Sequence, residues 1–371
     1  MSPDFNITPS EEDIDFDDAA AELEDRQSSP PTYEIATYPA DFTLEVLVSK
    51  WKSEEIFIPP FQRGYVWNQV QASKLIESFL VGLPVPSIFL YTESGTERSM
   101  VVDGQQRLKS VFYFFEGSFG EPNARGMRPV FSLKGLNEDS PFANKTFADL
   151  ENENETAARK LKNSVLRAFM IRQLNPNDDT SVFHVFERLN TGGTFLHNQE
   201  VRNAICAGPF NEMLHECNTY APWRRILGKP RPDSRMRDIE LILRFFALRH
   251  ASDRYEKPMK DFMSKYMSTH KDHDASIIEE FRKEFMSMID VIDAELGPRP
   301  FHLYAGFNSS VFDSVAVAVS KHLDAIPPDL KRRWELLAQS EKLRESVMGG
   351  TTDVDQVRSR MKLAEDTLFH G

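Results

Sequence analysis

The chain has 371 residues and a formal net charge of −13, and 40% of its residues are apolar. This apolar share supplies an ordinary hydrophobic core, which excludes a wholly disordered protein. No run of residues approaches the roughly 20 apolar positions that a membrane-spanning helix needs, and the N-terminus lacks the pattern of a secretory signal. Two cysteines, Cys206 and Cys217, are too few for a disulfide framework or a zinc set. We therefore expect a soluble, cytoplasmic protein with two domains.

The negative charge is concentrated at the N-terminus. Residues 1–31 hold ten acidic residues against one basic residue, Arg26, a net charge of −9, so the other 340 residues carry only −4. This stretch ends in the polar, proline-containing run Gln27–Pro31, which favours an extended linker. We predict an acidic disordered tail over residues 1–35, followed by a nearly neutral folded part whose surface potential varies from patch to patch.

Residues 36–175 show the pattern of an α/β domain. Apolar residues recur at helical spacing behind the capping residue Thr43 and again before Gly82, which is a typical helix stop. Residues 117–175 are less regular, apart from a final strand. The expected helices are 44–51, 70–81 and 108–115, and the expected strands are 56–61, 85–91, 99–102 and 165–171.

Residues 176–371 are dominated by helical periodicity. The expected helices are 181–189, 199–207, 239–250, 277–296, 310–323, 330–339 and 354–368. The predicted fold class is therefore α+β, with an α/β N-terminal domain and a mostly helical C-terminal domain.

The sharpest local motif is Val101-Val102-Asp103-Gly104-Gln105-Gln106-Arg107-Leu108, where a buried strand meets a glycine turn and a helix. The first N–H groups of a helix lack internal partners and carry a partial positive charge, so such a junction suits an anion. Gln105 and Gln106 can donate amide hydrogens, and the Arg107 fork matches phosphate oxygens. Asp103 either caps the helix or holds a divalent metal beside a polyphosphate. A simple helix cap explains the spacing about as well.

A second Gln-Arg pair, Gln62-Arg63, follows the strand predicted over 56–61 and precedes Gly64 and the aromatic residues Tyr65 and Trp67. If the two strands lie side by side, both pairs reach the same edge of the sheet and can converge on one ligand.

These motifs resemble the N-terminal domain of GmrSD-type restriction endonucleases. The resemblance rests on Ile58-Pro59-Pro60-Phe61-Gln62-Arg63, on the helix and turn over 76–84, and on Asp103-Gly104-Gln105-Gln106-Arg107, in matching order and spacing. It implies a ParB/sulfiredoxin-like fold and the binding and hydrolysis of nucleoside triphosphates in defence against modified foreign DNA. It further implies that Asp103, Gly104, Gln105, Gln106 and Arg107 line the nucleotide-phosphate site, and that Gln62 and Arg63 complete it. We expect Asp103 and Arg107 to act in catalysis, because Arg107 can neutralise charge on the phosphoryl group and a metal held near Asp103 can orient it.

The resemblance continues through Phe186–Thr194 and Glu200–Ala204. It implies secondary roles for four residues, which are Glu187, Arg188, Asn190 and Asn203. An ordinary turn between helices explains the loop at Asn190 about as well.

A basic window over residues 223–237 contains six basic residues and one acidic residue. Such a cluster suits DNA phosphates, although the pattern favours a solvated loop, because basic clusters commonly flank helices. The predicted DNA-binding residues are Arg224, Arg225, Lys229 and Arg231.

The sequence thus predicts a nucleotide-binding, NTP-hydrolysing sensor component of a DNA-directed restriction or anti-phage defence system. The cofactor would be Mg²⁺ or Mn²⁺ with the triphosphate, the metal lying at Asp103, and no membrane is involved. The nine histidines form no evident nuclease set, and no P-loop motif occurs. The resemblance implies pairing with an HNH-like nuclease, either fused or as a partner chain, so a separate HNH-type nuclease is a candidate partner. The alternatives are a non-catalytic DNA-binding module that recruits such a nuclease, and a ParB-like nuclease.

Overall fold

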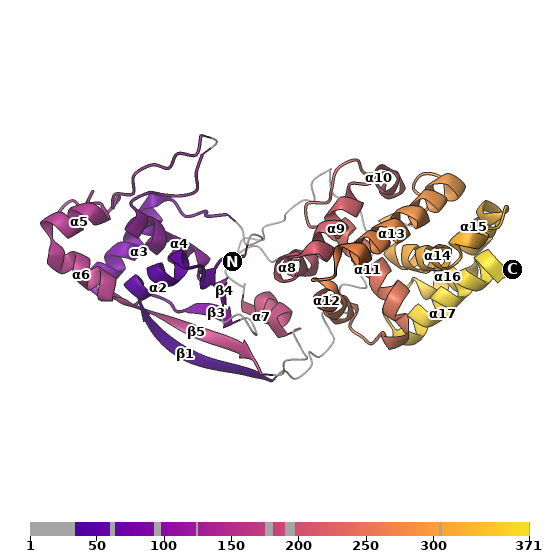
Figure 1. Cartoon of the computed structure of the whole chain (residues 1–371), viewed down its shortest axis with the longest axis horizontal. Helices are drawn as coiled ribbons and strands as arrows, with labels where there is room; N and C mark the ends of the chain where they lie inside the picture. The colour runs from indigo at the N-terminus through magenta and orange to yellow at the C-terminus, as the bar shows by residue number, and fades with distance from the viewer. Residues whose placement is uncertain are drawn as a thin grey trace, which may run out of the picture. The chain divides into compact units, whose positions relative to one another are not determined.

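The computed structural model of the chain describes residues 34–59, 64–92, 98–123, 125–174, 181–189, 197–303 and 306–370. These residues divide into two compact units, one within residues 32–196 and the other from His197 onward. The first combines a β-sheet with helices and the second is almost entirely helical (Figure 1). The predicted α+β fold class is therefore confirmed.

The sheet of the first unit has five strands in the order β1-β5-β3-β4-β2. β1 and β5 form a long antiparallel ribbon, β3 runs parallel to β5, and β4 runs antiparallel to β3. The short strand β2 pairs in parallel with β4, so both strands end at the same edge of the sheet. The strands are β1 (Ile35–Thr43), β2 (Ile56–Phe57), β3 (Ile88–Thr92), β4 (Ser99–Asp103) and β5 (Val165–Gln173).

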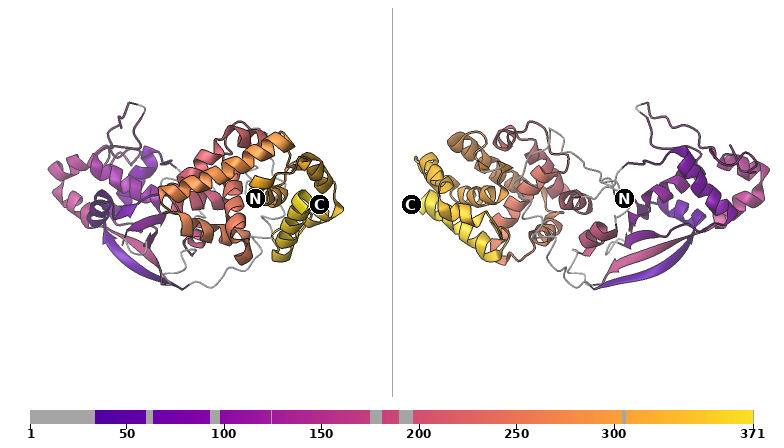
Figure 2. Two further views of the ribbon diagram at one scale, coloured as in Figure 1. Left: turned by 45° about the vertical axis from the view of Figure 1, so that its right-hand side comes forward. Right: turned by 180° about the vertical axis from the view of Figure 1, so that it is seen from behind.

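Helices α2 to α6 lie on one side of this sheet (Figures 1 and 2). Thr43 caps α2 by accepting the Val46 N–H, and Asn68 and Gln71 form a reciprocal capping box at the start of α3. Gly82 ends α3 in the left-handed conformation, as the sequence predicts. The helices are α2 (Leu44–Lys52), α3 (Gln69–Val81), α4 (Gln105–Glu116), α5 (Phe147–Glu153), α6 (Glu155–Asn163) and α7 (Ser181–Leu189).

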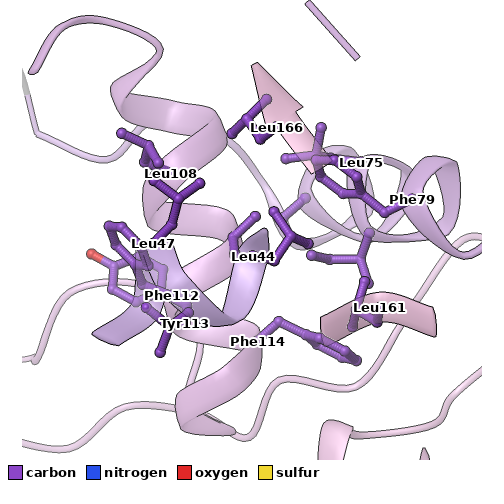
Figure 3. Close-up of a cluster of buried hydrophobic side chains, with 14 of the residues drawn as sticks. Leu44, Leu47, Leu75, Phe79, Leu108, Phe112, Tyr113, Phe114, Leu161 and Leu166 are labelled. Atoms are coloured by element: carbon purple, nitrogen blue, oxygen red, sulfur yellow. The ribbon is translucent and has the colours of Figure 1, made fainter. Parts of the chain in front are cut away.

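The core of the first unit lies between α2, α3, α4, α6 and the sheet. Figure 3 shows Leu44 and Leu47 of α2 packed among residues of α3, α4 and α6, with Leu166 of β5 contributing from the sheet. Trp51 stacks on Phe112 with ring centroids 4.7 Å apart. α4 begins at the predicted functional motif, and its buried face fixes it in this core.

The structure differs from two of the predicted boundaries, that of the N-terminal tail and that of the strand over 56–61. The tail predicted over residues 1–35 overlaps β1, which begins at Ile35, while residues 1–33 lie outside the described residues. The sequence signal for β1 is weak because it is an edge strand with mostly exposed side chains, and an edge position tolerates Pro39. Of the strand expected over 56–61, Ile56 and Phe57 pair with β4 and the described residues Ile58 and Pro59 lie outside the strand, while residues 60 and 61 are not described.

The second unit is built around α14, in which every residue from Ser309 to Ser320 is buried. This helix packs against α11, α13 and α17. No helix in the described ranges is both long and apolar enough to cross a membrane. The helices are α8 (Asn198–Ile205), α9 (Pro209–Asn218), α10 (Ala221–Leu227), α11 (Arg237–Ala251), α12 (Met259–His270), α13 (Ala275–Leu296), α14 (Ser309–Lys321), α15 (Leu330–Ala338), α16 (Glu341–Ser346) and α17 (Val354–Glu365).

Ser73 generates a test of how the irregular segment after α4 is held. Its buried hydroxyl donates to the Gln69 carbonyl at 2.6 Å and accepts the Lys134 N–H at 2.9 Å. Ser73→Ala removes that acceptor, so we expect the free energy of unfolding in urea to fall by about 1–3 kcal/mol. Ser78→Ala, on the same helix, loses a hydroxyl that bonds back to the Lys74 carbonyl, and should change stability by less than about 0.5 kcal/mol. Equal losses would contradict this role of Ser73.

Candidate functional site

The predicted motif lies where β4 passes into α4. Asp103 is the last residue of β4, and Gly104 adopts the left-handed conformation with φ +100° before α4 begins at Gln105. A Cβ at Gly104 would collide with the side chain of Ile88 on the neighbouring strand β3. Glycine is therefore required at this junction both by the backbone conformation and by the close approach of β3.

Arg107 connects this junction to the chain that enters β3. Its guanidinium donates to Asp103 Oδ2 at 2.6 Å and to the carbonyl oxygens of Pro86 and Ser87 at 2.8 Å each. The Arg107 side chain is 15% exposed and that of Asp103 is 33% exposed. The pair stands near the surface at the edge of the sheet, but part of the Arg107 fork is engaged within the fold.

Gln106 connects α4 to the segment that follows the second Gln-Arg pair. Its Oε1 accepts the N–H groups of Val66 and Trp67 at 2.9 and 3.2 Å, and its Nε2 donates to the Gly64 carbonyl at 3.3 Å. Gln105 and Gln106 are both buried. The amide of Gln106 was expected to serve a ligand, whereas the structure shows it holding the chain after residue 63.

The predicted pair Gln62 and Arg63 lies outside the described residues. Two observations bear on the expected convergence of the two motifs. β2 is the parallel neighbour of β4, and Gly64, which directly follows Arg63 in sequence, is a hydrogen-bond partner of Gln106. The chain on both sides of residues 60–63 is therefore attached to the same sheet edge as Asp103.

Tyr65 extends the contacts of the junction. Its hydroxyl forms a hydrogen bond of 2.7 Å with Ser110 Oγ, which in turn donates to the Gln106 carbonyl. Burial raises the pKa of Tyr65 to about 12, so the phenol stays protonated at neutral pH and supplies no base. The ring also packs edge-on against Tyr113. Tyr65 therefore connects the segment after Arg63 to α4 through its contacts with Ser110 and Tyr113.

The sequence interpretation did not identify an aromatic pair beside Asp103. Phe89 lies directly opposite Asp103 in the β3–β4 ladder, and its ring stacks on Phe169 of β5 with centroids 5.3 Å apart. Both side chains are partly exposed. No spacing in the sequence indicates this pair, because parallel pairing of β3 with β5 is needed to bring the two rings together.

Of the four residues with predicted secondary roles, Arg188 belongs to the first unit and Asn203 to the helical unit. Arg188 is exposed near the end of α7, while the side chain of Glu187 and all of Asn190 lie outside the described residues. Asn203 belongs to the helical unit, where its Oδ1 accepts a hydrogen bond from Asn211 at 2.9 Å and contacts His215 Nε2 at 2.5 Å. Burial lowers the pKa of His215.

The basic window over 223–237 is largely engaged in the helical unit. Arg224 is 8% exposed, and it donates to Asp238 at 2.7 Å and to the carbonyl oxygens of Lys229 and Arg231. Arg225 is exposed and pairs with Asp293 on α13. The window is therefore not the continuous basic loop of the sequence interpretation. Arg231 is exposed and Lys229 is partly exposed, whereas Arg224 faces inward.

Within the described ranges, His322, Glu365 and His370 bring three ligand atoms close enough to share a metal ion, far along the chain from the predicted motif. Asp103 supplies a single carboxylate, of which Oδ2 accepts the bond from Arg107. A Mg²⁺ ion bound with a polyphosphate takes only one or two protein carboxylates, so Asp103 with its second oxygen fits such an ion.

The fold and this junction define an α/β domain in which Asp103–Arg107 lie where β4 passes into α4. Residues 44–207 match the family described as GmrSD restriction endonuclease, N-terminal domain. No curated protein matches the chain. The chain therefore carries a GmrSD-type N-terminal domain, as its motifs predict, and this domain points to a component of a restriction or defence system. The match covers Asp103–Arg107 and extends through α8.

Gln106 offers a test of the bridge between the two motifs. Gln106→Ala leaves the N–H groups of Val66 and Trp67 without their acceptor, and we expect a loss of about 1–3 kcal/mol in the free energy of unfolding. Amide hydrogen exchange at residues 64–67 should become faster. Gln106→Glu keeps an acceptor oxygen and should preserve most of the protection. Unchanged exchange in Gln106→Ala would show that other contacts hold this segment.

Substitution of two neighbouring arginines tests how much a buried and an exposed ion pair each contribute to the free energy of unfolding. Arg224→Ala leaves the carboxylate of Asp238 buried without this partner, so we expect a loss of about 3–5 kcal/mol in unfolding free energy. Arg225→Ala breaks an exposed ion pair and should cost less than about 1 kcal/mol. Urea denaturation of both variants measures the difference. Similar losses would contradict the inward placement of Arg224.

Proposed function

We propose that the protein is a nucleotide-binding, NTP-hydrolysing sensor component of a restriction or defence system directed against DNA. The observation that carries this proposal is the parallel pairing of β2 with β4 at the edge where α4 begins. This pairing holds the strand that precedes Gln62 and Arg63 in the sequence beside the strand that ends at Asp103. The match to the GmrSD N-terminal domain supports the same conclusion.

The start of α4 is the proposed phosphate site. Gly104 is its N-cap and, as a glycine, has no side chain with which to cap the first N–H groups of the helix. The partial positive charge of the helix end favours phosphate oxygens, and the missing Cβ permits a close approach. Arg107 adds a full positive charge within the first turn.

A divalent metal would lie at Asp103 in this proposal. Mg²⁺ or Mn²⁺ supplies charge neutralisation and orientation of the phosphates when it is bound. Arg107, with its bond to Asp103, holds the carboxylate in place and stabilises negative charge on the transferred phosphoryl group. Arg63 is proposed to add to that stabilisation, and Gln62, Gln105 and Gln106 to orient the nucleotide. No residue is assigned as general base.

DNA and a separate HNH-type nuclease are the proposed macromolecular partners. Restriction requires a chain that cuts, and the match concerns the N-terminal domain of such an enzyme. Arg225, Lys229 and Arg231 remain the proposed contacts to DNA phosphates, since each keeps at least part of its surface in solvent. Arg224 is not included, because its position in the core would require the surrounding bonds to break.

A second candidate function is a non-catalytic DNA-binding module that recruits a nuclease. It is favoured by the bonds that engage Gln106 and Arg107 within the fold, since these give the motif a structural reason to exist without a nucleotide. The two functions differ in whether a nucleotide binds and whether its phosphate is released.

The deciding experiment uses the full chain with each of the four ribonucleoside triphosphates, Mg²⁺ or Mn²⁺, and duplex DNA present or absent. Calorimetry measures binding, and a phosphate assay measures hydrolysis. Binding with phosphate release supports the enzyme. If neither occurs while DNA still binds in a salt-sensitive manner, the non-catalytic module is the correct function.

Arg107 gives the sharpest prediction within the proposed site. Arg107→Ala removes a charged donor, so we expect nucleotide affinity to fall by about 1.5–3 kcal/mol in calorimetry. Arg107→Lys keeps the charge without the planar fork and should recover part of the affinity. Arg159→Ala, which breaks an exposed ion pair on α6, is the matched control and should leave affinity unchanged. Unchanged affinity in Arg107→Ala would move the nucleotide site elsewhere.

A further inference from the structure

Two histidines and one glutamate meet where α14 and α17 end. His322 follows the last residue of α14, Glu365 is the last residue of α17, and His370 lies in the turn after α17. One ligand atom from each residue lies within 4.8 Å of the other two. His322 Nε2 and Glu365 Oε1 are already 3.1 Å apart.

The backbone after α17 explains why Glu365 and His370 meet. Residues Asp366–His370 form a π-helical turn that continues the helix. Hydrogen bonds in a π-helix join residues five apart, so this wider turn brings position 370 back over position 365. The close packing of α14 against α17 then supplies His322 from the other helix. A regular α-helical turn would place residues four apart in register instead.

Neighbouring side chains orient His322 and Glu365 and hold the turn that carries His370. The ring of Phe369 stacks on His322 with centroids 4.4 Å apart and an angle of 17° between the planes. Lys321 Nζ holds Glu365 Oε2 at 3.0 Å, which leaves Oε1 on the side of His322. Arg333 donates to the Leu368 carbonyl at 3.2 Å and so fastens the π-helical turn. Such orienting partners are typical of metal ligands.

We propose that His322, Glu365 and His370 bind a Zn²⁺ ion that fastens the end of α14 to the end of α17. Two imidazole nitrogens and one carboxylate oxygen are a ligand set that Zn²⁺ favours, with water completing a tetrahedron. Ligand atoms about 2.0–2.1 Å from zinc lie about 3.3 Å from one another in a tetrahedron, close to the present separation of His322 and Glu365. His370 is exposed and completes the set from the end of the turn.

Lys321 is the group that competes with the metal. Its ammonium already pairs with Glu365, so the proposed site binds zinc through Oε1 alone and keeps Lys321 on Oε2. In the described part of the chain, this is also the place where two histidines and a carboxylate come this close. The site is separate from the β4–α4 junction, and its test is independent of nucleotide binding.

The test titrates ZnCl₂ into chelator-treated, tag-free full-length protein by calorimetry. We expect one site whose occupation raises the Tm, and visible absorption bands of tetrahedral Co²⁺ when cobalt replaces zinc. His370→Ala, at an exposed position, should weaken zinc binding by about 100-fold, and Glu365→Gln should do the same while keeping the shape of the side chain.

His273→Ala is the matched control, since His273 is outside the cluster, and it should retain zinc binding and the rise in Tm. Thermal unfolding without metal shows that each variant folds. Absence of a zinc site in the wild-type chain would overturn the proposal. Equal zinc affinity in wild type, His370→Ala and Glu365→Gln would overturn it as well, because the metal would then bind elsewhere.

Discussion

The passage from β4 into α4 depends on the close approach of Gly104 to Ile88. Because the backbone there is left-handed and faces the neighbouring strand, the strand can end and the helix begin within one residue. Arg107 and Gln106 then reach back from the first turn of α4 to two other segments, the entry to β3 and the chain after residue 63. The proposed phosphate site thus includes two side chains that connect three parts of the domain. Nucleotide binding at that site would be coupled to local stability through these side chains.

The helical unit places several of its positive charges in its interior. Arg202 and Arg224 are buried and pair with Glu240 and Asp238, and Arg360 is buried with bonds to three backbone carbonyls. Counting basic residues in a sequence window therefore overstates the charge available to DNA. The useful quantity is the charge that lies at the surface, and Arg231 is exposed there.

Local signals predicted those elements whose cause is local. The Thr43 and Asn68 caps and the Gly82 stop mark α2 and α3, and the apolar periodicity of residues 181–189 matches α7. β1 was missed because an edge strand buries few of its side chains and so shows little alternation. The family of the N-terminal domain was also predictable, because its motif is a continuous run of residues, Asp103–Arg107.

The sequence by itself determined the fold class, the motif at the end of β4 and the concentration of negative charge in residues 1–31. Only the tertiary structure decided that Gln106 and Arg107 bond within the fold, that Arg224 faces the core, and that Phe89 stacks on Phe169. It also decided that His322 meets Glu365 and His370. The physical reason is the same in each case. These contacts join residues far apart in the chain, and their partners follow from strand register and helix packing, which no local spacing encodes.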